Sequence, residues 1–474
     1  MGDWATDTLP FSQGQMSGLA ELAGAQPLVV NAIAEPTGTL LARPGIASWS
    51  DFPSAIPNAS PVVGMVPFGG DLIYVTEDRR LWRLTGGSVL ALTDTTDATT
   101  SLASALRPIM LALRDKVVVA GGGAIQKWVG GAILSERLGG SPPVATHVAG
   151  IATRIVAMRA DASGQFQWSR AGDGGHETWD ALNFAEAEAK PDVLRALHDN
   201  TNEVFAFGAE TLQVFSPDAN TGFTPGRTLN LGLLAPYSVV RMDDDFVFLD
   251  RERRFVLTDS RTYGPDSVIS TGIERTLREL GRVDDCFGLR MRIDAWDAAV
   301  WFFPTDGKGF VWERRLGKWA EWRAWSGTDW AEPSITSAVS WPEENVILVG
   351  LATGQIARLA PGVTADLSAI LKVQVRTPFV DHKTNNLKHC KAVRFRFKRG
   401  AQTTAPEVRL SYRDDTGAFR PLPALTLGGL GEYDPVVEVR SVGTYRVRQW
   451  DMVYTSTPGF TFVGAEETFE VLAN

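Results

Sequence analysis

Short runs of alternating apolar and polar residues fill most of this chain, and very little of it follows the period of a helix. Such alternation predicts β-strands, because successive side chains of a strand point to opposite faces. The best helical candidate is the stretch 270–281, where Ile273, Leu277 and Leu280 share one face between a capping serine and a glycine. The pattern therefore predicts an all-β protein with one short helix.

One type of strand recurs along the chain. It has a polar start followed by four or five residues rich in Val, Ile and Phe. Its copies begin at Asp71, Asp115, Thr153, Asn202, Asp244, Ala298 and Glu344. Their mean spacing is about 45 residues, and a repeat of this length made of short antiparallel strands is typical of a β-propeller blade. The spacing predicts a propeller of six or seven blades over residues 61–362, with a series of β-sandwiches as the structural alternative.

Two segments flank this repeat. Residues 363–474 consist of alternating runs without the blade spacing, which predicts a C-terminal β-sandwich-like module. The charge changes at the same place, from a net −12 over residues 1–362 to a net +3 over residues 363–474. Residues 1–60 are interrupted by prolines, so we expect an irregular N-terminal arm that packs along other domains or subunits.

Composition excludes several classes of protein. The net charge of −9 argues against a general nucleic-acid coat. No apolar run is long enough for a transmembrane helix and the start has no signal-peptide pattern, so we expect no membrane anchoring and no secretory signal. Cys286 and Cys390 are too few for a disulfide framework and predict free buried thiols. The histidines and cysteines form no metal-binding motif, and we expect no metal and no cofactor.

Catalytic motifs are also missing from the sequence. It has no phosphate-binding loop and no nucleophile elbow, and nothing selects a pair of carboxylates for glycoside hydrolysis, so we expect no enzyme. Eight tryptophans lie between Trp296 and Trp341, and we interpret them as packing residues between blades. The acidic triplet Asp243–Asp245 predicts a solvated hairpin loop. A sugar platform made by the tryptophans leaves a glycan-binding or glycan-cleaving propeller as the alternative function.

A cationic strand is the one candidate binding surface. The stretch 382–406 carries seven Lys and Arg residues and no acidic residue. Within it, Arg394, Arg396 and Lys398 alternate with apolar residues, so a strand would have one apolar and one cationic face. We interpret the cationic face as a partner-docking face, with a merely solvated face as the alternative.

Three stretches resemble the tail nozzle or tail hub proteins of short-tailed bacteriophages, which are also called packaged DNA stabilization proteins. The first is 28–49, with an Arg-Pro-Gly turn at 43–45, and the third is the strand–turn–strand 407–422, whose Asp-Thr-Gly replaces the family's Asp-Gly. The second, 166–217, is the most specific. Its matching residues are Trp179, Phe184, Ala185, Pro191, Asp192, Phe207, Gly208 and Thr211.

The resemblance implies a structural virion protein of the phage tail, made in the cytoplasm of the host bacterium. Such proteins form a homo-hexamer below the portal and its adaptor, the head-to-tail connector, and support tail spikes or fibres. The ring retains packaged double-stranded DNA and provides the channel for DNA ejection, without sequence-specific binding. Six copies of this chain would carry about −54 formal charges, and an acidic lumen would repel DNA phosphates.

Overall fold

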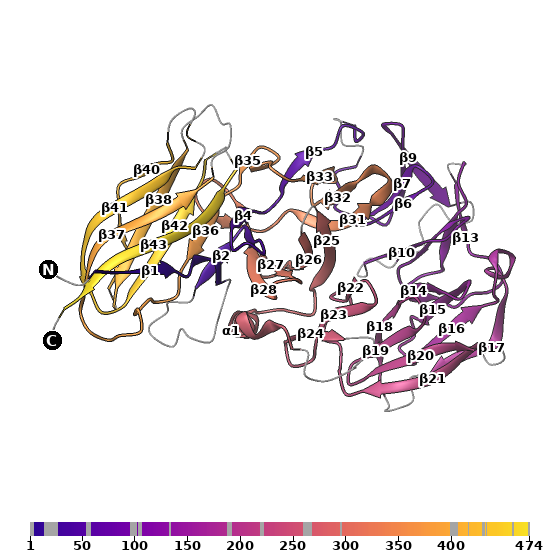
Figure 1. Ribbon diagram of the computed structural model, residues 1–474. Helices are drawn as coiled ribbons and strands as arrows, with labels where there is room; N and C mark the ends of the chain where they lie inside the picture. Colours follow the sequence, from indigo (N-terminus) through magenta and orange to yellow (C-terminus); the bar gives the residue numbers. More distant parts are fainter. Residues whose placement is uncertain are drawn as a thin grey trace.

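Figure 1 shows the computed structural model of the chain, in which a propeller lies beside a C-terminal module that also holds both chain ends. The structure describes residues 4–13, 27–53, 58–94, 102, 107–131, 134–186, 192–218, 222–258, 268–293, 296–398, 406–415, 417–428, 432, 434–456 and 459–472. Within these residues the regular structure is almost entirely β-strand. Among them, no helix has the length and apolar character needed to cross a membrane.

Within the described residues, the propeller consists of seven groups of three or four antiparallel strands, and each group is a blade. The last strands of the first two blades also pair with each other in parallel, which joins these blades into one eight-stranded sheet. Blade 1 consists of β6 (Val62–Phe68), β7 (Asp71–Thr76), β8 (Leu81–Thr85) and β9 (Ser88–Asp94). Blade 2 consists of β10 (Ile109–Ala112), β11 (Val117–Ala120), β12 (Gln126–Trp128) and β13 (Leu134–Arg137). Blade 3 consists of β14 (Ala145–Ile151), β15 (Arg154–Arg159), β16 (Gln165–Ser169) and β17 (Trp179–Glu186). Blade 4 consists of β18 (Leu194–Asp199), β19 (Val204–Gly208), β20 (Leu212–Asp218) and β21 (Gly222–Leu229). In each of these blades the strands follow one another in sequence order.

The remaining blades vary this plan. Blade 5 has the three strands β22 (Val240–Met242), β23 (Asp245–Leu249) and β24 (Phe255–Thr258). Blade 6 consists of β25 (Phe287–Ile293), β26 (Trp296–Phe303), β27 (Lys308–Glu313) and β28 (Lys318–Trp322). Blade 7 consists of β31 (Ile335–Trp341), β32 (Val346–Leu351), β33 (Ile356–Ala360) and the N-terminal strand β5 (Gly45–Ser48).

The recurring strand of the sequence is the second strand of every blade, namely β7, β11, β15, β19, β23, β26 and β32. Every residue of β7, β11 and β19 is buried. Neighbouring blades cover both faces of such a strand, which explains why it is rich in Val, Ile and Phe and does not alternate strictly. The predicted all-β propeller is confirmed, and the structure has seven blades.

An N-terminal strand closes the ring of blades. β5 pairs antiparallel with β33 of blade 7, from Ala357↔Ser48 to Ala360↔Gly45. A Cβ atom at Gly45 would lie 2.5 Å from the carbonyl oxygen of Val363, so only glycine fits there. The predicted arm is thus not irregular throughout, because short strands within residues 1–60 join sheets formed late in the chain.

The C-terminal module is a sandwich of two sheets. One sheet contains β2 (Leu28–Val30), β36 (Val373–Arg376), β42 (Arg448–Tyr454), β38 (Glu407–Asp414), β39 (Arg420–Pro421) and β40 (Leu425–Thr426), and β2 also joins it to blade 6. The other contains β3 (Ala32–Ala34), β4 (Leu40–Ala42), β43 (Thr461–Val471), β37 (Lys388–Phe397), β41 (Val436–Tyr445) and β1 (Trp4–Leu9). Val375, Phe395 and Trp450 belong to the apolar core between the sheets.

One short helix, several 3₁₀ turns and two small hairpins complete the described structure. The predicted helix is a 3₁₀ turn, η3 (Ser270–Gly272), followed by α1 (Glu274–Glu279), and Leu277 packs into the core beside blades 5 and 6. Two hairpins, β29 (Ala324–Trp325) with β30 (Trp330–Ala331) and β34 (Ala365–Asp366) with β35 (Ala369–Ile370), flank blade 7 in sequence. The other 3₁₀ turns are η1 (Phe11–Gln13), η2 (Asp173–Gly175) and η4 (Pro342–Glu344).

The tryptophan-rich stretch packs as expected. Six of its eight tryptophans are buried, namely Trp296, Trp301, Trp312, Trp319, Trp322 and Trp341. Trp312 and Trp319 face each other across the β27–β28 hairpin, whose turn ends at Gly317 with a φ of 63°. Cys286 and Cys390 are both buried and free, as predicted.

Candidate partner interface and propeller axis

The predicted docking face lies on β37 and on the residue after it, in the sheet of the C-terminal module where β37 pairs with β43 and β41. Arg394, Arg396 and Lys398 are exposed, whereas Phe395 and Phe397 point into the core and are buried. The predicted alternation of one apolar and one polar face is therefore confirmed.

The neighbouring strands supply acidic partners to this face. Arg394 Nε donates a 2.9 Å hydrogen bond to Glu438 on β41, and Arg396 Nη2 lies 3.3 Å from Glu466 on β43. The bond from Arg394, together with Arg440, holds the pKa of Glu438 below its ordinary value. Arg394 and Arg396 are therefore exposed but already paired with carboxylates of the same sheet, which alternation along the strand could not indicate.

A buried ionic cluster lies inside the same module, and sequence reasoning did not find it. Arg448 and Glu467 are both fully buried. Arg448 Nε donates a 2.7 Å hydrogen bond to Asp414, and the Tyr445 hydroxyl donates a 2.6 Å bond to Glu467. These partners compensate the cost of burying charge, which is high for an unpaired group.

His382 extends the cluster to the N-terminal strand. Its Nδ1 lies 3.0 Å from the Asp7 carboxylate of β1, its Nε2 lies 3.6 Å from Glu467, and its ring stacks on Phe469 at 4.0 Å. Burial alone would lower the pKa of His382, but the carboxylates of Glu467 and Asp7 raise it overall. A protonated His382 therefore adds an ion pair to the other contacts of β1, which are its pairing with β43 and the packing of Trp4 against His389 and Lys391.

The first strand of each blade lies nearest the propeller axis. First strands of neighbouring blades contact one another, as β31 does with β6, β6 with β10, and β10 with β14. Side chains from these strands and from the loops entering them occupy the axis. His147 stacks on Tyr237 with ring centroids 5.7 Å apart, and His198 lies edge-on to His147 at 6.3 Å.

Arg107 and Tyr237, which precede the first strands of blades 2 and 5, meet across the axis. The Tyr237 hydroxyl accepts a 3.1 Å hydrogen bond from the Arg107 backbone N–H. The Arg107 guanidinium lies 3.6 Å over the Phe287 ring, and Nη1 donates to the Thr336 carbonyl. Burial lowers the pKa of Arg107 to about 10, which still leaves it charged at neutral pH. Arg107 and Tyr237 therefore form a plug across the axis.

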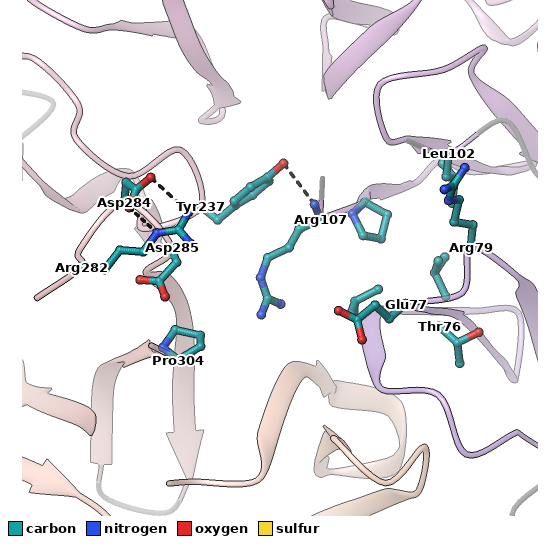
Figure 2. Close-up of a pocket in the computed structure, with 13 residues that line it drawn as sticks. Thr76, Glu77, Arg79, Leu102, Arg107, Tyr237, Arg282, Asp284, Asp285 and Pro304 are labelled. Carbon is teal, nitrogen blue, oxygen red and sulfur yellow. Dashed lines mark hydrogen bonds and ion pairs between the residues drawn. The ribbon is translucent and has the colours of Figure 1, made fainter. Parts of the chain in front are cut away.

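Two pockets share this plug as a wall, with volumes of about 360 Å³ and about 240 Å³. Figure 2 shows the larger one, where the Arg107 guanidinium points into the space between Asp285 and Glu77. The smaller is lined by Met65, Met110 and other residues of first strands. Cavities of this size are far too small for a DNA duplex, whose major groove alone is about 12 Å wide.

The acidic triplet connects two blades. Asp243 has a positive φ of 64° in the β22–β23 turn, and its carboxylate lies 2.8 Å from Arg290 and 3.2 Å from Arg314 of blade 6. Asp245 lies 2.6 Å from Arg314. The bond from Arg290 lowers the pKa of Asp243. The predicted solvated hairpin loop is confirmed, since Asp243 and Asp244 are exposed in the β22–β23 turn. The carboxylates of Asp243 and Asp245 in addition bridge blades 5 and 6.

The described residues contain no group of three or more His, Cys, Asp or Glu side chains arranged to hold a metal ion. The mouth of the larger pocket mixes acids with arginines, and Arg282 is already paired with Asp284 at 2.7 Å. This arrangement provides binding contacts and structural bridges.

Comparisons with known proteins show that the propeller is similar to one protein family. Residues 67–281 match the family described as "Bacteriophage P22 Gp10, beta-propeller". A search of curated proteins finds no relative. Solved structures with related folds include the computationally designed Ika8 protein (14% identity, 73% of this chain and 100% of that chain, TM-score 0.38) and BamB from Moraxella catarrhalis (12% identity, 76% and 98%, TM-score 0.37). A third is an exo-β-1,3-galactanase from Phanerochaete chrysosporium (12% identity, 80% of this chain and 98% of that chain, TM-score 0.27).

Proposed function

Because residues 67–281 belong to the family of bacteriophage P22 Gp10, a phage DNA-stabilization and tail protein, we propose that this chain forms the tail nozzle or hub ring below the portal and its adaptor. Six copies would surround a lumen through which DNA leaves the particle. The family is one of structural virion proteins, so the chain should act without turning over a substrate. Purified protein should leave host surface polysaccharide uncleaved.

The closed propeller axis supports a lumen between subunits. Arg107 and Tyr237 plug the axis, and the pockets beside them are too small for a duplex. DNA would therefore pass along surfaces of the ring and not through any propeller. Residues 1–362 carry a net −12, so surfaces of this part that face the lumen would repel phosphates and let DNA slide.

The C-terminal module supplies the docking surfaces of this proposal. Arg394, Arg396 and Lys398 would meet the adaptor, a fibre or another virion protein, and would not hold DNA. A strongly basic channel would retain DNA through counterion release, which opposes rapid ejection. The division into an arm (1–60), a propeller (61–362) and a C-terminal module (363–474) belongs to the same proposal, with the arm binding the other parts together.

Depletion of the chain from phage particles tests this function. Particles made without it should package DNA and then lose it, so that nuclease digests the escaped DNA while heads remain intact. Complementation with the wild-type chain should restore retention. Full retention without the chain would contradict the proposal, and cleavage of host polysaccharide by the purified protein would favour a glycan-cleaving propeller instead.

A further inference from the structure

Blade 3 carries the most exposed large apolar side chain of the described residues. β17 pairs with β16 at Gln167↔Phe184 and again at Ser169↔Trp179, so residues 180–183 bulge out of the ladder. The Asp180 carboxylate accepts a 3.0 Å hydrogen bond from the Leu182 backbone N–H, which fixes this bulge. Leu182 is 82% exposed and nearby Phe184 is 41% exposed. The result is a rigid apolar protrusion, which we call the Leu182 bulge (residues 180–184).

An apolar pocket lies at the junction between the propeller and the C-terminal module. Its volume is about 240 Å³, and Trp296, Phe460 and Leu41 line it. We call it the junction pocket. The β34–β35 hairpin follows the lining residue Thr364 directly and exposes Leu367 and Ile370, at 36% and 46%. Exposed apolar side chains next to an apolar cavity mark an interaction surface.

The protrusion and the pocket lie on opposite sides of the molecule. The junction pocket is lined by Trp296 of blade 6 and by Pro361–Thr364 after blade 7, whereas the Leu182 bulge belongs to blade 3. Blade 3 lies halfway around a ring of seven from the junction of blades 6 and 7. Figure 1 shows β17 at the end of the molecule farthest from the C-terminal module. The two features therefore cannot meet within one chain.

A protrusion on one side and a matching pocket on the other are the two surfaces that a head-to-tail contact between copies of a chain requires. Such contacts use two different patches at each junction and close into a ring when the rotation allows it. A leucine side chain with its neighbouring aromatic is small enough for a cavity of about 240 Å³. Buried anchors in pockets carry most of the affinity of protein interfaces.

We propose that the Leu182 bulge of each subunit inserts into the junction pocket of the next copy of this chain. The inference rests on the ring proposed above, and it names the two surfaces that build that ring. It commits to a second copy as the occupant because the same chain presents both halves of the contact.

A single substitution on the protrusion tests the contact. Leu182→Asp should weaken self-association of the full-length chain at each junction by roughly tenfold or more, because a charge replaces a buried leucine. The control is Val471→Asp, which introduces the same charge at another exposed apolar residue, at the far end of β43 from the pocket residue Thr461. Sedimentation over a concentration series measures both. Equal self-association of both variants and the wild type would overturn the proposal.

A cross-link tests the geometry independently of affinity. The double variant Leu182→Cys, Val363→Cys should form intersubunit disulfides under mild oxidation, giving a ladder of linked species up to a closed ring on a non-reducing gel. Each single variant should give no ladder, because the native cysteines Cys286 and Cys390 are buried. A ring that assembles without any cross-link would contradict the proposed contact.

The two proposals fail in different ways. If the chain is present in phage tails as a ring, but the cysteine pair does not cross-link and Leu182→Asp assembles normally, then the contact is wrong and the tail function stands. If the purified chain cross-links into rings but is absent from virions, then the contact is supported and the tail function is wrong.

Discussion

Arg314 and Arg315 are adjacent at the end of β27, but they differ in what they contact. Arg314 donates 3.1 Å to the Met242 carbonyl and lies within ion-pair distance of Asp243 and Asp245 in blade 5, whereas Arg315 is exposed. Blades touch mainly through apolar faces, which fix no particular register between them. Charged contacts of this kind fix how blade 5 sits against blade 6.

Replacing Arg314 and Arg315 one at a time measures how much the charged contact between blades 5 and 6 contributes to stability. Arg314→Met should lower the free energy of unfolding by about 1–2 kcal/mol, because it removes the ion pair to the largely buried Asp245 carboxylate and one of the two arginines beside Asp243. Arg315→Met should change it by less than about 0.5 kcal/mol, as exposed substitutions usually do. Urea denaturation at neutral pH gives both values. Equal effects of the two variants would mean that the bridge contributes nothing specific.

Two axial histidines make the propeller sensitive to acid. Burial lowers the pKa of His147 to about 3, with a further contribution from His198, and burial lowers the pKa of His198 to about 4. Both rings are neutral when folded, whereas in the unfolded chain they take up protons near pH 6.5. The unfolded state therefore binds more protons below pH 6.5, and stability falls as the pH decreases toward the folded values.

The expected loss is up to about 2 kcal/mol per histidine at pH 5, since each pH unit below 6.5 is worth about 1.4 kcal/mol. His147→Phe should therefore lose less stability than the wild type between pH 7 and pH 5. The control is His389→Phe, a change on β37 at a half-buried ring outside the axis. Denaturation curves at the two pH values provide the comparison. An unchanged pH dependence in His147→Phe would show that this ring is already protonated in the folded protein.

Strand β1 is held to the module by its pairing with β43, by the contacts of Trp4 with His389 and Lys391, and by one ion pair. It pairs only with β43 among the described strands, and Asp7 reaches His382 at 3.0 Å. The pKa of Asp7 is lowered, chiefly by its bond to His382, and the pKa of His382 is raised. The attachment is thus fully present below pH 6.5 and above pH 3.8. It weakens as the pH rises through the folded pKa of His382, and also as the pH falls through that of Asp7.

Asp7→Asn should loosen this strand without unfolding the module. At pH 6 we expect the amide protons of residues 4–9 to exchange roughly two to five times faster, since the partly exposed pair contributes about 1 kcal/mol or less. Asp51→Asn, at an exposed carboxylate that is bonded to Ser50, serves as the control. If exchange in β1 is the same in both variants, the ion pair does not hold the strand.

The propeller could be predicted from the sequence because its signal is local and repeated. The second strand of each blade is buried on both faces, so seven Val-, Ile- and Phe-rich runs occur at a regular spacing. The closing strand β5 could not be found in this way. It is four residues long, follows Pro44, and pairs with β33 more than 300 residues later, so no local pattern marks it.

The candidate site was only partly readable for the same reason. The exposure of Arg394 and Arg396 follows from alternation along one strand, but their pairing with Glu438 and Glu466 depends on which strands lie beside β37. The contact of His382 with Asp7 joins residues that are 375 positions apart. Hydropathy does not encode such register, which is fixed only when the whole sandwich assembles.

At the scale of the whole molecule, the docking face should matter for assembly and not for DNA affinity. The triple variant Arg394→Gln, Arg396→Gln, Lys398→Gln should yield heads that package DNA and lose it, with infectious titre reduced at least about tenfold, whereas single changes should be mild. The control changes three exposed, paired arginines of the propeller, Arg275→Gln, Arg278→Gln and Arg282→Gln. Full titre from the first triple variant would mean that this face is only solvated surface.

Electron microscopy of intact virion tails would image the proposed ring itself. We expect six copies of this chain in one closed ring below the adaptor, with DNA density confined to the lumen between subunits. The axis of each seven-bladed propeller should be filled at Arg107 and Tyr237 and should contain no DNA. Three-fold or twelve-fold symmetry for this chain, DNA threaded through a propeller, or absence of the chain from the tail would contradict it.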